Sequence, residues 1–247
     1  NSLDWVTYLN YDREKTRSYL RKPDQKIDLI IPRGGEKLIA FVKEHANCPV
    51  IVSGRGNNFV YVAQDADKAK ALEIIINAKT AKISACNALD KVIIDKALPG
   101  YDQFVKELIV KLNAEKVTVL ASKDLSKFEG VEETEDESLW FKEFLDYKIL
   151  LGSVDSLSGG INMINKYGGG HSASIGSENK QEVSHFLSAV DAAAVYHNAS
   201  TRFTDGFQFG LGGELAISTD KLHQRGPIGL QHLVTNKWYV YGNGQIR

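Results

Sequence analysis

Lys26-Ile-Asp-Leu-Ile-Ile31, Glu36-Lys-Leu-Ile-Ala-Phe-Val-Lys-Glu44 and Pro49-Val-Ile-Val52 together decide the fold class of this chain. The first and last are short, nearly unbroken apolar runs, which is typical of parallel strands covered on both faces. Pro32-Arg-Gly-Gly35 forms a turn that leads into the helix-like middle run. Strand, turn, helix and strand in this order predict an α/β fold.

The same alternation continues along the chain. We expect further strands at residues 59–62, 91–95, 117–120, 150–154, 172–175, 192–196 and 237–241. Helices are expected at residues 13–20, 65–79, 101–112, 156–167 and 182–190, the first of them capped by Asp12. Residues 132–137 are interpreted as an acidic turn, and residues 198–213 as an irregular, glycine-rich stretch.

The composition is that of an ordinary globular protein, with 247 residues, 43% apolar and 25% charged. A net charge of −1 argues against nucleic acid as a partner, because nucleic-acid binders usually carry a basic excess. No apolar run reaches the roughly 18–20 residues that span a bilayer, so no membrane partner is expected. Two cysteines make no disulfide framework, which favours a reducing, cytoplasmic compartment. The six histidines show no ligand spacing, so we expect no metal site.

Cys86 is the candidate nucleophile. It lies between a helix-like run and a strand-like run, where a thiol is accessible. Backbone N–H groups at such a junction can lower the thiol pKa or stabilise an oxyanion, and Asn87 is a further donor. On spacing alone, a small buried cysteine is an equally good interpretation. Cys48, at the start of a predicted strand, is interpreted as a packing residue.

Other polar segments are candidate ligand sites. Pro32 to Gly35 and Gly54 to Gly56 are glycine turns after predicted strands, where backbone can approach a phosphate. Neither matches a dinucleotide fingerprint, and an ordinary turn is the simpler interpretation of each. Asn198-Ala-Ser-Thr-Arg202 concentrates side chains that suit an anionic substrate group, although a loop that satisfies its own backbone is an equal alternative.

Four motifs occur in order along the chain: Ile27-Asp-Leu-Ile-Ile-Pro-Arg-Gly-Gly35, Ser84-Ala-Cys-Asn-Ala-Leu89, Asn198-Ala-Ser-Thr-Arg-Phe-Thr-Asp-Gly206 and Lys221-Leu-His-Gln-Arg-Gly-Pro-Ile-Gly-Leu230. Taken together they resemble the gamma-glutamyl phosphate reductases, a family of the aldehyde dehydrogenase superfamily. The resemblance runs from about Ile27 to Arg247. It implies an aldehyde dehydrogenase-like α/β fold, with a catalytic domain and the C-terminal part of a Rossmann-type cofactor domain.

The resemblance implies an NADPH-dependent enzyme of proline biosynthesis, which reduces L-glutamyl 5-phosphate to L-glutamate 5-semialdehyde and releases phosphate. Cys86 falls on the family's nucleophile, whose thiolate would expel phosphate and form a thioacyl enzyme. Val52 stands where hydrolytic aldehyde dehydrogenases carry a glutamate base, and an apolar side chain cannot activate water. The alternatives are a coenzyme A-acylating aldehyde dehydrogenase and an inactive fragment that acts only in oligomerisation.

The resemblance also implies further site residues. Glu143, taken alone a solvated residue, matches the glutamate that holds the nicotinamide ribose of NADP(H). Arg33, Gly34 and Gly35 match the turn that lies near the cofactor phosphates in the family. Recognition of substrate or phosphate falls on Asn198, Ser200, Thr201 and Arg202. Arg202 is the favoured anion binder.

By the same comparison the chain, which begins at Asn1, is expected to be a C-terminal fragment. Residues 1–80 would be the C-terminal part of the NADP-binding domain. Residues 81–232 would be the catalytic domain, and residues 233–247 an oligomerisation strand. The expected partners are a small-molecule substrate, further copies of the chain as a homo-oligomer, and the kinase that makes the acyl phosphate.

Overall fold

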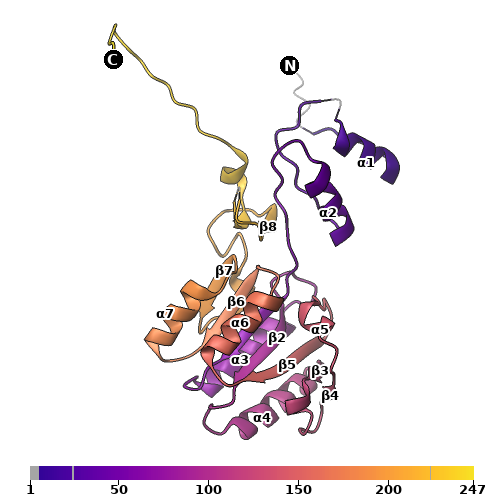
Figure 1. Ribbon diagram of the computed structural model, residues 1–247, viewed down its shortest axis with the longest axis vertical. Helices are drawn as coiled ribbons and strands as arrows, with labels where there is room; N and C mark the ends of the chain where they lie inside the picture. Colours follow the sequence, from indigo (N-terminus) through magenta and orange to yellow (C-terminus); the bar gives the residue numbers. More distant parts are fainter. Residues whose placement is uncertain (1–5, 24, 223) are drawn as a thin grey trace.

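Seven parallel strands form one central sheet (Figure 1). The computed structural model describes residues 6–23, 25–222 and 224–247. The strands are β1 (Asn58–Val62), β2 (Leu89–Asp95), β3 (Thr118–Ala121), β4 (Glu132–Glu133), β5 (Lys148–Val154), β6 (Ser172–Gly176) and β7 (Ala194–His197). Their order across the sheet is β4-β3-β5-β2-β1-β6-β7, and every pairing is parallel, which confirms the predicted α/β class.

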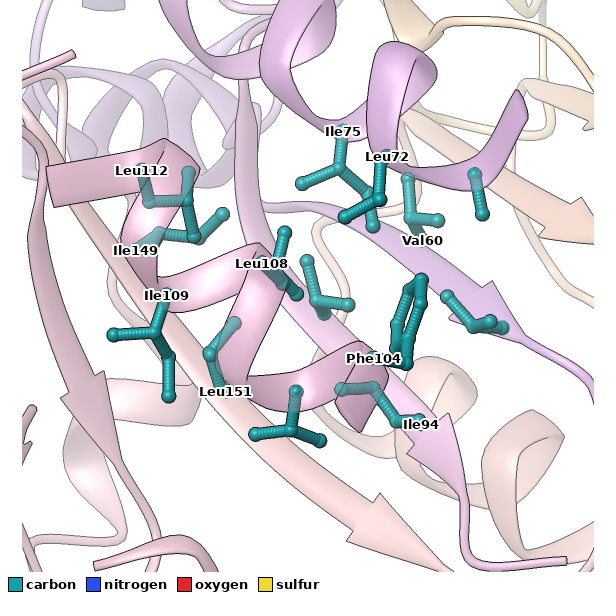
Figure 2. Packing of buried hydrophobic residues seen from close by; sticks show 14 of the residues in the cluster. Val60, Leu72, Ile75, Ile94, Phe104, Leu108, Ile109, Leu112, Ile149 and Leu151 are labelled. Atoms are coloured by element: carbon teal, nitrogen blue, oxygen red, sulfur yellow. The ribbon is translucent and has the colours of Figure 1, made fainter. Parts of the chain in front are cut away.

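Helices cover both faces of the sheet (Figure 1). They are α3 (Lys68–Thr80), α4 (Tyr101–Ala114), α5 (Ser138–Phe141), α6 (Leu157–Tyr167) and α7 (Lys180–Ala189). Figure 2 shows α3 and α4 on one face, where Leu72 and Leu108 pack with Val60 of the sheet. On the other face Phe186 of α7 packs against Tyr61. Each fully buried side chain of this size contributes roughly 1.5–3 kcal/mol. Among the described residues, no helix combines the length and apolarity needed to cross a membrane.

Two helices precede the sheet and stand apart from it (Figure 1). They are α1 (Arg13–Arg21) and α2 (Glu36–His45), close to the ranges predicted for them. The carboxylate of Asp12 accepts a hydrogen bond from the backbone N–H of Lys15 at 2.7 Å, so it caps α1 as expected.

The predicted strands at residues 26–31 and 49–52 are reduced to a single parallel bridge between Ile30 and Val50. The apolar pattern of these runs was correctly recognised, but a strand requires neighbours along its whole length. The described chain supplies only one short pairing at this place. Ile51 and Val52 are nonetheless buried.

Three further expectations are corrected in the second half. Residues 132–137 contain the short edge strand β4, because Glu132 and Glu133 continue the sheet beside β3. An antiparallel pair that was not predicted follows the glycine-rich stretch, formed by β8 (Ala216–Ser218) and β9 (Gly226–Ile228). Residues 237–241 are not a strand in the described chain, and Tyr241 is 92% exposed. Their role as an oligomerisation strand stays a prediction, since it requires a second chain.

The expected domain boundary near residue 80 stays a prediction, and in this structure it falls between two strands of one sheet. β1 lies between β2 and β6 in the middle of the sheet, and α3 contributes Ile75 to the same core as Leu112 of α4. These contacts make residues 58–80 part of the unit that carries Cys86. The first strand of this sheet begins at Asn58.

Candidate active site

Cys86 lies in the loop between the end of α3 and the start of β2. Asn58 pairs with Leu89, and Phe59 with Ala173, so the amino ends of β1, β2 and β6 line one edge of the sheet. The loop of Cys86 is at this amino edge. The half-buried thiol is free of disulfide bonding, as is that of Cys48.

Asn58 fixes the backbone of this loop. Its side-chain amide is fully buried and lies 2.6 Å from the carbonyl oxygen of Gly56. It lies 2.7 Å from each of the carbonyl oxygens of Cys86 and Ala88. One amide therefore joins the segment before β1 to the carbonyl groups of the nucleophile candidate and of Ala88, two positions after it.

Gly56 brings Glu143 close to the same loop. A Cβ atom at Gly56 would overlap the carbonyl oxygen of Cys86 and would lie 2.6 Å from Oε1 of Glu143. Only a residue without a side chain fits between them. The glycine turn thus allows a close approach of backbone to the Cys86 loop, and the Glu143 carboxylate lies beside the same glycine.

The backbone on each side of Glu143 is held by a charged residue of β2. The ammonium of Lys91 donates to the carbonyl oxygen of Lys142 at 2.8 Å, and the N–H of Phe144 donates to the carboxylate of Asp90 at 3.1 Å. Burial raises the pKa of Glu143, and the nearby Asp90 carboxylate raises it further. Because two successive strand residues hold the flanking peptide groups, the position of Glu143 is fixed by the sheet.

Asp90 and Lys91 belong to a buried charged group that also contains Lys79. The ammonium of Lys79 lies 3.2 Å from the carboxylate of Asp90, and both side chains are buried. Desolvation by burial raises the pKa of Asp90 and lowers that of Lys79. It lowers the pKa of Lys91 to about 7. Buried charges are retained when they are paired, and here the pairing also orders the Glu143 segment.

The pKa of the Cys86 thiol is raised, contrary to the expectation of a lowered value. Burial is the largest cause, followed by the negative charges of Glu214 and Glu143. The backbone N–H of Cys86 and the positive charge of Arg33 act in the opposite direction, as expected for backbone dipoles, but they do not prevail. Glu214, which sequence reasoning missed, accepts a hydrogen bond from the N–H of Gly206 at 2.8 Å.

Asn87 ties the Cys86 loop to the turn η2 (Thr201–Phe203). Its amide donates to the carbonyl oxygens of Thr204 at 2.9 Å and Arg202 at 3.2 Å, and its own carbonyl oxygen accepts from the Thr201 hydroxyl at 2.8 Å. Both amide hydrogens are thereby used, so the side chain of Asn87 is a positioning group rather than the expected oxyanion donor. Ser200 is buried and its hydroxyl accepts from the N–H of Arg202 at 3.3 Å.

Arg202 and Asn198, both predicted to bind substrate, lie in different places. The Nε and Nη1 atoms of Arg202 are buried and have no hydrogen-bond partner among the described residues. Asn198 follows the carboxyl end of β7, where its amide donates to the carbonyl oxygen of Ser177. Strands of four or five residues separate it by roughly 15 Å from the edge that carries Cys86. A direct contact of Asn198 with a substrate on Cys86 is therefore not supported.

The turn at residues 32–35 is near the site through Arg33. This exposed side chain donates to the carbonyl oxygen of Leu215 at 3.0 Å, and its charge acts on Cys86 and on Glu214. Gly34 has a φ of 156°, and Gly35 is the N-cap of α2. No group of three or more histidine, cysteine, aspartate or glutamate side chains in the described part of the chain is arranged to hold a metal ion.

Comparison with known proteins shows which family the chain belongs to. No family model matches the chain. It is 46% identical over 239 residues to the gamma-glutamyl phosphate reductase of Clostridium botulinum strain Eklund 17B, covering 96% of this chain and 57% of that protein. The enzyme of the same description from Enterococcus faecalis is 43% identical over 248 residues, with 98% and 58% covered. The chain belongs to the gamma-glutamyl phosphate reductase family.

Solved structures agree with this relationship. The gamma-glutamyl phosphate reductase of Thermotoga maritima matches with a TM-score of 0.89 at 40% identity, over 96% of this chain and 57% of that chain. An acetylating aldehyde dehydrogenase of Geobacillus thermoglucosidasius matches with a TM-score of 0.70 at 18% identity, over 96% of this chain and 61% of that chain. The second match shows the shared aldehyde dehydrogenase-like fold. The chain spans 57–58% of the length of these three gamma-glutamyl phosphate reductases.

The sequence analysis missed several residues that build the site around Cys86. They are Asn58, Asp90, Lys91 and Glu214. Two consecutive charges inside the apolar run of β2 were the available signal for Asp90 and Lys91, because charged residues are rarely buried unless paired. Asn58 contacts the Cys86 loop and the charge of Glu214 acts on Cys86, in both cases between segments distant in the sequence, and no local pattern marks either residue.

Proposed function

We propose that this chain carries the thiol chemistry of an NADPH-dependent gamma-glutamyl phosphate reductase. The reaction converts L-glutamyl 5-phosphate into L-glutamate 5-semialdehyde and phosphate. The observation that carries the proposal is the position of Cys86. In a chain 46% identical to a named member of the family, the thiol loop is held by Asn58 and borders both the Glu143 segment and the loop of Arg202.

Cys86 is the nucleophile of this proposal. Its thiolate attacks the acyl carbon, a carbon–sulfur bond forms, and the carbon–oxygen bond to phosphate breaks with phosphate as the leaving group. Burial, followed by the charges of Glu214 and Glu143, keeps the pKa of the thiol high, so the neutral thiol predominates at neutral pH and the reaction requires a group that accepts its proton. Val52 is buried and apolar and cannot serve as a base, which favours transfer of the acyl group over hydrolysis.

Glu143 and the Arg33 turn are the proposed contacts to NADPH. A half-buried carboxylate with a raised pKa, held beside a glycine that leaves no room for a side chain, suits the hydroxyl groups of a ribose. When bound, NADPH would supply hydride to the thioacyl carbon. The role of the chain's own residues is to hold Glu143 through Lys91 and Asp90 and to keep the acyl group on Cys86.

The acylation step can be tested on the chain itself. We expect acetyl phosphate, and gamma-glutamyl phosphate generated in situ, to place a hydroxylamine-sensitive acyl group on Cys86, detected by mass spectrometry of the intact chain and of its peptides. Cys48→Ser is the matched control and should acylate like the unmodified chain, whereas Cys86→Ser should not. Acyl transfer to Cys48 alone, or to neither cysteine, would refute the covalent mechanism.

The remaining assignments stay proposals. These are the cytoplasmic location, the homo-oligomer with residues 233–247 as its joining strand, and the kinase that makes the acyl phosphate as a partner. The coenzyme A-acylating alternative is not favoured, because the acetylating aldehyde dehydrogenase shares only the fold at 18% identity. An inactive fragment that acts only in oligomerisation is not favoured either, since the Cys86 loop and its supports are formed within the chain.

A further inference from the structure

A chain of four hydrogen-bonded side chains lies between the sheet and the turn η2. The hydroxyl oxygen of Thr204 lies 2.6 Å from that of Ser172 and 2.7 Å from that of Tyr196. The Ser172 hydroxyl in turn lies 2.7 Å from Nδ1 of His171. Thr204, Ser172 and His171 are buried, and Tyr196 is half-buried. The acyl transfer proposed for the nucleophile uses none of these four side chains.

The strands place these hydroxyl groups on the side of the sheet that faces α3. Ser174 pairs with Val60 of β1 and with Tyr196 of β7. Because side chains alternate along a strand, Ser172 and Tyr196 project from the same face as Val60. Val60 belongs to the apolar cluster under α3, the helix that leads into the nucleophile loop. The turn η2, which contacts both α3 and β6, therefore meets the sheet on the face that carries this helix.

The Thr204 hydroxyl ties the end of the turn to two strands at once. It has one hydrogen and two hydroxyl neighbours, so to satisfy both it donates one hydrogen bond and accepts the other. Hydrogen bonds in such a buried chain polarise and strengthen one another. The Thr204 side chain is therefore held by Ser172 of β6 and Tyr196 of β7 together.

The backbone of Thr204 connects this anchor to the nucleophile loop. Its carbonyl oxygen accepts a hydrogen bond from the side-chain amide of Asn87 at 2.9 Å, and Asn87 directly follows Cys86. The hydroxyl of Thr201 donates to the backbone carbonyl oxygen of Asn87 at 2.8 Å. A carbonyl oxygen has no proton to give, so the contact transmits position to the loop and not a proton to the thiol.

We propose that Thr204 is a positioning residue for Cys86, which holds the nucleophile loop on β6 and β7 through Asn87. Asn58 attaches the same loop to β1, so three neighbouring strands would fix the thiol. This inference rests on the proposed function, because it concerns the acylation of Cys86. It assigns a role in that step to a side chain that acts only through another residue.

Thr204→Val keeps the shape of the side chain, removes the hydroxyl and tests the assignment. We expect the maximal rate of Cys86 acylation by acetyl phosphate to fall roughly 10- to 100-fold with little change in the half-saturating concentration, since a displacement of about 1 Å costs up to about 100-fold. The pH profile of Cys86 alkylation by iodoacetamide should move to lower pH, because a looser loop buries the thiol less. Thr204→Ser keeps the hydroxyl and should restore both.

Ser174→Ala is the matched control. It removes another buried hydroxyl of β6, which donates to the carbonyl oxygen of Ala199 at 2.7 Å and, among the described residues, forms no hydrogen bond with Thr204 or Asn87. This change should lower stability and leave both reactions of the thiol unchanged. Tyr196→Phe removes one of the two Thr204 bonds and should have a smaller effect than Thr204→Val. Added to Thr204→Val it should change nothing further, since both remove the same interaction.

The outcomes separate this inference from the proposed function. Unchanged acylation and alkylation in a Thr204→Val variant that is folded by circular dichroism would overturn the inference. An equal effect of Ser174→Ala, or no recovery in Thr204→Ser, would also overturn it, because the effect would then come from a general loss of packing. If acetyl phosphate does not acylate the unmodified chain, the proposed function fails. The alkylation profile of Thr204→Val then decides alone, with a shift to lower pH supporting the inference and no shift overturning it.

Discussion

Replacing Asn58 with alanine removes the amide that joins Gly56, Cys86 and Ala88. The amide nitrogen carries two hydrogens, so at most two of the three carbonyl oxygens are bonded at a time. A buried polar group left without its partner costs about 1–3 kcal/mol. Two such losses predict that Asn58→Ala lowers the free energy of unfolding by about 2–6 kcal/mol.

The same change should loosen the Cys86 loop and alter the thiol. Burial is the largest cause of the raised pKa of Cys86, so a looser loop lowers that pKa and increases the thiolate fraction at neutral pH. The rate of alkylation by iodoacetamide at pH 7 should then rise roughly tenfold for each unit by which the pKa falls. Urea unfolding gives the stability, and the alkylation rate as a function of pH gives the pKa.

Asn57→Ala is the matched control. Its buried amide also donates to two carbonyl oxygens, those of Trp140 at 2.6 Å and Tyr167 at 2.8 Å, and among the described residues it forms no hydrogen bond with the Cys86 loop. We expect a similar loss of stability with little change in the reactivity of Cys86. The reasoning is refuted if Asn58→Ala leaves the alkylation profile of Cys86 unchanged, or if both variants shift it equally.

Three further predictions concern charge. The charge of Glu214 raises the pKa of Cys86, so Glu214→Gln should move the pH profile of Cys86 alkylation to lower pH. The charge of Arg33 lowers the same pKa, so Arg33→Met should move the profile to higher pH. Shifts in the opposite directions would contradict these assignments. The folded-state pKa of Lys91 is lowered to about 7, so the unfolded chain binds more protons between pH 7 and 10.4. The unfolding free energy of the unmodified chain should therefore rise relative to Lys91→Met across this window, by at most about 5 kcal/mol, and a constant difference in urea titrations would argue against a buried neutral lysine. The pKa of His171 is lowered by burial to about 4, so its contribution to stability is present above pH 6.5 and is lost as the pH falls towards 4. His171→Phe should reduce this acid sensitivity by roughly 3 kcal/mol, measured by unfolding at pH 4 and pH 7.

Much of the sheet could be predicted because burial on both faces leaves a local pattern. Residues 91–95 and 150–154 contain short apolar runs, Val92 to Ile94 and Leu150 to Leu151, and both ranges lie within strands that form as expected. The same pattern failed at residues 26–31 and 237–241, because pairing depends on a neighbouring strand that the run itself does not specify. At Glu132 and Glu133 the pattern missed a strand that does form, since an edge strand exposed to solvent shows no apolar signal.

The sequence by itself determined the α/β class, the family relationship and Cys86 as the nucleophile candidate, because these depend on runs and motifs contiguous in the chain. Only the tertiary structure decided what surrounds the thiol. It placed Gly56, Glu143 and Glu214 near Cys86, gave Asn87 to the loop of Arg202, and removed Asn198 to the opposite edge. The physical reason is that hydrogen bonds and desolvation act between atoms that are close in space, and here residues up to 128 positions apart (Cys86 to Glu214) share one environment.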